Sequence, residues 1–308
     1  MDWFASEEAC VRYLERLRWR AGFACPSCGV VAEPYRANRA RLMCRHCRYQ
    51  ASVTAGTVFD KTRTPLRTWL AAAWYLTNQK QGVSALGLQR VLGIGSYETA
   101  WAMLHRLRRA MVRPDRTLLS GSVELDETYV AITDRQVPVS IAGKKSRTTQ
   151  LFVAIAIERL EPRGFGRLRL ALLPRDSKEY VHAFIQRVIA PGSKLYTDGS
   201  AAYRKLADHG YEHHPMAITG STRAAHEVLP GVHRVAALLQ RWILGTHHGA
   251  VQPRHLEQYL NEFVFRFNRR TSRSRGLLFY RLLQQAVITE PVIYDHLIRP
   301  VPIIHFAG

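Results

Sequence analysis

Four cysteines are the residues of this sequence whose type and spacing most directly indicate chemistry. Cys25, Cys28, Cys44 and Cys47 form the pattern C-x2-C-x15-C-x2-C. Two such hooks supply four thiolates at a spacing that suits one structural Zn²⁺, so the pattern predicts a zinc ribbon. Two disulfides are the alternative, but they need an oxidising compartment, and the N-terminal residues do not resemble a secretion signal. The fifth cysteine, Cys10, lies in a helical pattern and is expected to be a packed free thiol.

Two aspartates make a second candidate centre. Asp126 lies in the middle of a strand-like segment, with Glu124 on the same face and Glu127 on the opposite face. Asp198 stands at the carboxyl end of another apolar strand. A carboxylate inside a sheet is costly to bury unless it is paired or holds a cation, and two side by side can hold divalent ions for phosphoryl transfer. Taken singly, Asp126 also fits an exposed edge strand, and Asp198 also fits an Asp-Gly turn.

The segments that would position these acids alternate between strand and helix patterns. Strand patterns cover residues 122–132, 150–158, 167–173 and 193–197, and a helical pattern covers 177–189. Three strands, a helix, a strand and then helices are the order of an RNase H-like domain. The C-terminal part of the chain is therefore predicted to be an α/β domain with a mixed sheet flanked by helices.

The N-terminal part has mainly helical patterns. A short amphipathic helix is expected over residues 6–19, the last ribbon strands over 49–59, and a further helix from Pro65 onward. Residues 84–92 and the segment that begins at Ser96 are both helical in period and are separated by Gly93-Ile94-Gly95. Two helices joined by a glycine-containing turn, the second of them basic, predict a helix-turn-helix. Its expected phosphate contacts are Arg106, Arg108 and Arg109.

Composition and charge favour a protein that binds a polyanion. The chain has 308 residues, and 44 Lys and Arg against 24 Asp and Glu give a formal net charge of +20. This charge is typical of a protein that binds a nucleic-acid backbone, although a well-solvated basic surface is the alternative. Because no apolar run is long enough to span a bilayer, we expect no membrane partner and a cytoplasmic, nucleoid-associated protein.

Several stretches in a fixed order resemble a known family. These stretches are residues 123–130 (VELDETYV), 196–200 (YTDGS), the helix around His233, 245–248 (GTHH) and 263–270 (FVFRFNRR). Together they resemble the insertion-sequence transposases of the ISXO type, which join a zinc ribbon to an RNase H-like DDE domain. The resemblance implies cleavage and strand transfer at transposon ends with Mg²⁺ or Mn²⁺, without a covalent protein–DNA intermediate. It also implies that Asp126 and Asp198 are the first two catalytic acids.

The third catalytic position departs from the common pattern of this family. A glutamate usually stands on a helix about 35 residues after the second aspartate, and that count leads here to His233. His233 is therefore the candidate, as a ligand better suited to Mn²⁺ than to Mg²⁺, or as a group that orients water. A histidine packed at a helix start is the alternative, and Glu227 is a rival third acid. The family's downstream lysine is replaced by Gln240, next to Arg241, and both are expected to contact DNA.

Two further groups of residues could contact a ligand. Residues 261–275 mix phenylalanines with arginines, and we expect the phenylalanines to pack a helix onto the sheet while Arg269 and Arg270 contact phosphates. A second metal site is disfavoured, because adjacent histidine pairs lack a convincing ligand pattern. These pairs are His213 with His214 and His247 with His248.

The sequence thus predicts four regions and one main function. The regions are residues 1–60 (N-terminal helix and zinc ribbon), 61–115 (helix-turn-helix region), 121–290 (RNase H-like domain) and 291–308 (tail). The predicted function is that of a DDE transposase with structural Zn²⁺, acting on double-stranded transposon-end and target DNA as a homo-oligomer. The competing hypotheses are a catalytically impaired or domesticated DNA-binding protein and a metal nuclease or resolvase of the same fold.

Overall fold

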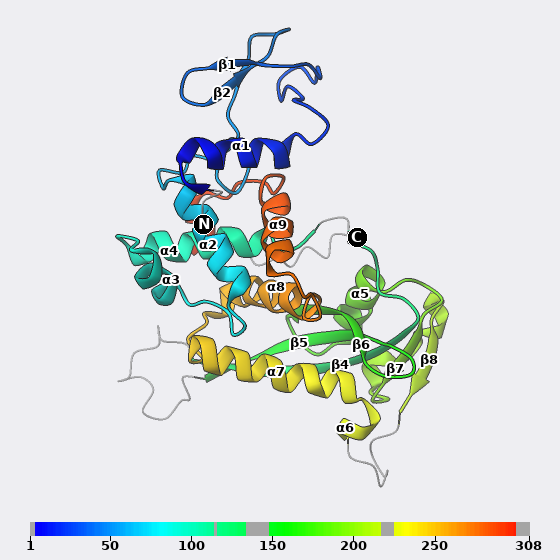
Figure 1. Ribbon diagram of the computed structural model, residues 1–308. Helices are drawn as coiled ribbons and strands as arrows, with labels where there is room; N and C mark the ends of the chain where they lie inside the picture. Colours follow the sequence, from blue (N-terminus) through cyan, green and yellow to red (C-terminus); the bar gives the residue numbers. More distant parts are fainter. Residues whose placement is uncertain (1–3, 114–115, 134–147, 217–224, 300–308) are drawn as a thin grey trace. The chain divides into compact units, whose positions relative to one another are not determined.

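The computed structural model describes residues 4–113, 116–133, 148–216 and 225–299, and the chain forms two compact units (Figure 1). The first unit contains Met1–Arg113 and Ser272–Ile298, and the second contains Pro114–Thr271 and Arg299–Gly308. Within the described residues, no helix is long and apolar enough to cross a membrane.

The first unit consists of a small ribbon and a set of helices. The ribbon sheet has the strand order β1-β2-β3 with antiparallel pairing. The elements are α1 (Glu7–Arg18), β1 (Tyr35–Ala37), β2 (Arg41–Met43), β3 (Gln50–Ala51), α2 (Leu66–Asn78), α3 (Ala85–Leu92), α4 (Tyr97–Arg109), α9 (Arg275–Ala286) and α10 (Tyr294–Ile298). The strands expected over 49–59 are reduced to β3, because the chain turns after it: the Ser52 and Thr57 hydroxyls accept hydrogen bonds from nearby backbone N–H groups.

Local capping explains where these helices begin. The hydroxyls of Ser6, Ser84 and Ser96 accept hydrogen bonds from the first turns of α1, α3 and α4. Each bond satisfies an N–H group that has no partner inside the helix. Between α3 and α4, Gly93 adopts a left-handed conformation with φ 62°, which a glycine tolerates without steric cost. The two predicted helices and the glycine-containing turn between them are therefore present.

The second unit is built on a five-stranded mixed sheet with the order β6-β5-β4-β7-β8. Its strands are β4 (Ser122–Thr133), β5 (Thr148–Arg159), β6 (Phe165–Leu173), β7 (Lys194–Thr197) and β8 (Glu212–Pro215). β4, β5 and β6 pair antiparallel, whereas β7 is parallel to β4 and β8 is parallel to β7. The four predicted strands and their order are confirmed, β4 is central rather than at an edge, and the short edge strand β8 was not predicted.

Helices cover both faces of this sheet and form two cores (Figure 1). On one face α7 (Pro230–His247) and α8 (Leu256–Phe267) pack on alternate side chains of β4 and β5. On the other face α5 (Lys178–Val188) and the 3₁₀ turn Ala201–Tyr203 close a second core. The short helix α6 (Ala225–Val228) precedes α7. The structure therefore confirms the predicted mixed sheet flanked by helices.

The C-terminal residues divide between the units differently from the predicted ranges. We expected residues 121–290 to form one domain, but Ser272–Ile298 packs with the first unit. The reason is α9, which buries Leu278, Phe279 and Leu282 within that unit, against α1 and α2. Burial of these large apolar side chains outweighs continuity along the chain.

Candidate functional site

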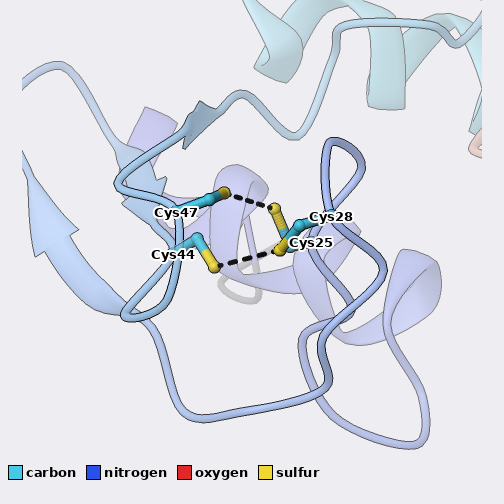
Figure 2. A group of neighbouring side chains, drawn as sticks. All are labelled: Cys25, Cys28, Cys44 and Cys47. Atoms are coloured by element: carbon cyan, nitrogen blue, oxygen red, sulfur yellow. Dashed lines mark hydrogen bonds between the residues drawn. The ribbon is translucent and has the colours of Figure 1, made fainter.

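The four predicted zinc ligands converge in the ribbon (Figure 2). The ligand atoms of Cys25, Cys28, Cys44 and Cys47 all lie within 4.8 Å of one another. The Sγ atoms of Cys25 and Cys47 are 3.5 Å apart, and those of Cys28 and Cys44 are 3.8 Å apart. These separations suit four sulfurs around one tetrahedral ion, so the donor set fits structural zinc.

Two equivalent backbone turns hold the hooks. Gly29 N–H donates to the carbonyl of Cys25 at 2.9 Å, and Arg48 N–H donates to that of Cys44 at 3.1 Å. Both donors follow the second cysteine of their hook and have positive φ, 72° for Gly29 and 63° for Arg48. The first position has the residue that this conformation favours, while the second places an arginine there at some steric cost.

The thiols also have the electrostatics of a cation site. Burial acts against ionisation of Cys25, but the N–H groups of Cys28 and Ser27 lower its pKa to about 7. The Val30 N–H lowers the pKa of Cys28, but burial and the neighbouring thiols outweigh this effect and raise the pKa to about 12. Four thiolates therefore form together only when a cation lies between them. Cys10 is separate from this group, fully buried and free, as predicted.

The second candidate centre lies where β4 and β7 run parallel. Glu124 pairs with Tyr196 in this register. Asp126 follows Glu124 by two residues within β4, whereas Asp198 comes directly after the end of β7, two residues beyond Tyr196. Because successive side chains of a strand alternate between faces, Asp126 belongs with Glu124 to the face that α7 covers. Asp198 also accepts a hydrogen bond from Ser200 N–H at 2.9 Å, so it forms the local turn as well.

The surroundings of Asp126 act against its ionisation. Burial, and after it the charge of Asp198, raises the pKa of Asp126 to about 6, although the Glu127 N–H and His233 act in the opposite direction. The Asp126 side chain is only 19% exposed. A buried carboxylate that lies near a second negative charge is a donor that a divalent cation would stabilise.

His233 lies close to this pair. Its Nε2 is 4.0 Å from Oδ2 of Asp126, and it stands in the first turn of α7, whereas Glu227 is exposed on α6. Asp126, Asp198 and His233 are not, however, as tightly grouped as the cysteines. Among the described residues, the four cysteines alone form a group of three or more such ligands within 4.8 Å.

A buried tyrosine on the opposite face was not anticipated from the sequence. The Tyr203 hydroxyl donates to Oε1 of Glu127 at 2.6 Å, and Tyr203 is 1% exposed. Burial raises the pKa of Glu127 to about 8 despite this bond, and the nearby charges of Asp126 and Asp176 add to the rise. Glu127 is therefore protonated at neutral pH. The sequence indicates that Glu127 and Asp126 point to opposite faces of the strand, but the hydrogen-bond partner of Glu127, Tyr203, lies 76 residues further along the chain.

The helix-turn-helix arginines divide into two types. Arg108 is 1% exposed and donates to the Val83 carbonyl at 3.2 Å. The prediction that it contacts phosphate does not fit this burial, because the side chain faces the interior of its own helical unit. Arg106 and Arg109 are half-buried and remain candidates. Helical periodicity alone did not distinguish the inward arginine from its neighbours.

The predicted DNA-contact residues of the second unit differ in exposure and partners. Gln240 and Arg241 are exposed on α7, and Gln240 Nε2 lies 3.4 Å from the Tyr129 carbonyl. Arg269 donates to the Phe265 carbonyl at 3.2 Å, and Arg270 donates to the carbonyls of Phe267, Gly166 and Phe165. Arg269 and Arg270 therefore form hydrogen bonds at the C-terminal end of α8. The three phenylalanines expected to pack on the sheet are buried: Phe263, Phe265 and Phe267.

The histidine pairs do not form a second metal site within the described part of the chain. His213 and His214 point differently on β8: Nε2 of His213 is 2.9 Å from the Thr197 hydroxyl, while His214 bonds Glu212 at 2.7 Å. In the other pair, His247 is buried and His248 is exposed.

Comparisons with known proteins agree with this arrangement. Residues 118–268 match the family model of the ISXO2-like transposase domain, and residues 5–50 match that of the transposase zinc-ribbon domain. A relative from Halobacterium salinarum, named an uncharacterized protein in transposable element ISH50, is 27% identical over 278 residues, which are 85% of this chain and 91% of the relative. The chain therefore contains a transposase zinc-ribbon domain and an ISXO2-like transposase domain.

Proposed function

We propose that the protein binds the DNA ends of an insertion sequence and catalyses metal-dependent strand cleavage and strand transfer. The observation that carries this proposal is the placement of Asp126 on β4 and of Asp198 directly after the neighbouring parallel strand β7, with His233 near Asp126 from α7. This arrangement lies inside the segment that matches the transposase domain. The family relationship supports phosphoryl transfer on DNA as the reaction class.

The two aspartates and the histidine have separate roles in this proposal. Asp126 and Asp198 would hold Mg²⁺ or Mn²⁺, which supplies stabilisation of the charge that develops on the phosphate oxygens. His233 would act as a third ligand or keep a water oriented beside Asp126, a task for which imidazole is suited near neutral pH. The Glu127–Tyr203 pair beneath them is uncharged at neutral pH and adds no further negative charge to the site.

Recognition of DNA is assigned to half-buried arginines in the first unit and to exposed residues of α7 in the second. The net charge of +20 provides the general attraction to phosphates. Within the helix-turn-helix we assign Arg106 and Arg109, and on α7 we assign Gln240 and Arg241. We expect the protein to act as a homo-oligomer, because strand transfer has to bring two transposon ends together.

The test is cleavage of labelled double-stranded DNA that carries the element ends, with Mn²⁺ or Mg²⁺. We expect nicking and joining by the wild-type protein, and their loss in Asp126→Asn and Asp198→Asn with DNA binding retained. Asp208→Asn is the matched control, because Asp208 is exposed in a separate 3₁₀ turn of the same unit. A wild-type protein that binds these ends but never cuts them would refute the catalytic assignment and leave a DNA-binding role. Cleavage without joining would identify a nuclease.

A further inference from the structure

Glu124 is a fully buried acid next to the candidate catalytic pair, and the roles above do not use it. Its side chain is 0% exposed in the middle of the sheet. Burying a carboxylate is expensive unless hydrogen bonds and an opposite charge compensate for it. The contacts of Glu124 therefore show what the fold gains from keeping an acid there.

One oxygen of this carboxylate caps α7. Oε2 accepts hydrogen bonds from Gly231 N–H at 2.6 Å and from Val232 N–H at 3.1 Å. These groups lie in the first turn of the helix, where N–H groups have no intrahelical partner and the helix dipole favours negative charge. The residue at the cap position, Leu229, gives no side-chain hydrogen bond. The start of α7 thus depends on an acid 107 residues earlier in the chain.

The space at this junction allows little movement. A Cβ atom added to Gly231 would lie 2.7 Å from Oε2 of Glu124 and 2.7 Å from Cε1 of Phe165. A side chain at position 231 would therefore collide with the Glu124 carboxylate and the Phe165 ring unless these side chains moved. The glycine allows the Glu124 carboxylate to lie directly against the first turn of α7.

The other oxygen connects the same junction to the strand that leads to Asp198. Arg159 Nε is 3.6 Å from Oε1 of Glu124, and its guanidinium lies over the Tyr196 ring, 4.8 Å from the centroid. Tyr196 is the β7 partner of Glu124 and stands two residues before Asp198. Glu124 therefore contacts α7 directly and β7 through Arg159.

We propose that Glu124 is a positioning residue that sets α7, and with it His233, against Asp126. Glu124 and Asp126 share one face of β4, and His233 follows the capped Gly231 by two residues, which places its Nε2 4.0 Å from Oδ2 of Asp126. Rotation or fraying of the first helical turn would move the imidazole away while leaving both aspartates on the sheet. This inference rests on the role proposed above for His233.

The experiment compares cleavage rates of Glu124 variants. Glu124→Ala removes the cap, whereas Glu124→Gln keeps an oxygen that can accept both N–H bonds. Leu195→Ala is the control: Leu195 is equally buried on β7 but belongs to the opposite core. At a temperature where every variant is folded, we expect E124A to lower the rate roughly 10- to 100-fold, as misplacement of a reacting group does. E124Q should keep most of the rate, and L195A should lose stability but not activity.

A double-mutant cycle shows whether the effect passes through His233. In a His233→Ala background, E124A should cause little further loss, because the group that it positions is already absent. A full additional loss in that background, or equal rates for E124A and L195A, would overturn the proposal. If E124A does not fold, Gly231→Ala replaces it, since the added methyl group disturbs the same junction from the helix side.

Hydrogen exchange separates this inference from the proposed function. Without DNA or metal, amide exchange at residues 231–233 should be faster in E124A than in L195A, and close to wild type in E124Q. If the wild-type protein never cleaves DNA, the catalytic proposal fails, and this exchange pattern still decides whether Glu124 fixes the first turn of α7. Unchanged exchange in E124A would contradict the positioning role whatever the activity.

Discussion

The ionised Asp126 should destabilise the metal-free protein, so Asp126→Asn should make that form more stable while removing activity. The physical reason is burial beside Asp198, which raises the pKa of Asp126 from 3.8 to about 6. The asparagine is uncharged, and its Oδ1 can still accept the 2.8 Å bond from Glu127 N–H. The substitution therefore removes a charge without removing the local hydrogen bond.

The size of the effect follows from the shift in pKa. About two pKa units correspond to roughly 3 kcal/mol of unfolding free energy, which is a ceiling because the side chain keeps some contact with water. The folded-state pKa lies above the unfolded one, so neutral Asp126 adds stability below about pH 4, and this contribution is lost as the pH rises through about 6. Near pH 7.5 we expect Asp126→Asn to raise the Tm of the second unit by roughly 5–10 °C.

Thermal unfolding measured with and without Mn²⁺ tests this reasoning. Without metal, the Tm difference between the variant and wild type should be small at pH 4 and largest above pH 6. Mn²⁺ should raise the Tm of the wild-type protein, because an ion that binds only the folded state stabilises it, but should have less effect on the variant. An Asp126→Asn protein that is less stable than wild type at pH 7.5, or that responds equally to Mn²⁺, would refute the argument.

Three further predictions concern the zinc ligands, the arginines and the third catalytic position. Cys28→Ser should abolish zinc binding and unfold residues up to about 59, as metal analysis and circular dichroism would show; zinc content equal to wild type would contradict the ligand assignment. Arg109→Ala should lower the slope of log affinity for DNA against log salt concentration by about one. Arg108→Met should leave this slope unchanged and lower the free energy of unfolding by about 1–3 kcal/mol. The reverse pattern would show that the buried Arg108 was wrongly excluded as a phosphate contact. His233→Ala should reduce cleavage roughly a hundredfold or more, and Glu227→Ala much less; greater sensitivity at Glu227 would move the third position there.

Most elements of the fold could be predicted because their signals are local. Ser6, Ser84 and Ser96 cap the helices that their positions indicated, since a capping hydroxyl reaches only its own first turn. The long strands of the sheet followed from continuous or alternating apolar patterns. β8 was missed because a four-residue parallel edge strand that contains two histidines and a proline has no such pattern. Its pairing with β7 comes from the sheet itself.

The burial of arginine was not predictable in the same way. Arg106, Arg108 and Arg109 lie within one helical turn and look equivalent in the sequence. Only the packing of α3 against α4 turns Arg108 inward to the Val83 carbonyl. The same applies to α9, because its apolar pattern in the sequence does not indicate which unit buries it.

The sequence by itself predicted the four cysteines that converge in the ribbon and indicated Asp126 and Asp198 as candidate acids, because each prediction depends on short-range spacing or on a position in or after a strand. Only the tertiary structure decided that β4, which carries Asp126, lies beside β7, which leads to Asp198, how near His233 comes to Asp126, and that Glu124 caps the helix carrying His233. These relations join residues about 70 to more than 100 positions apart. Such contacts form only when burial of the whole core repays the entropy of closing long loops.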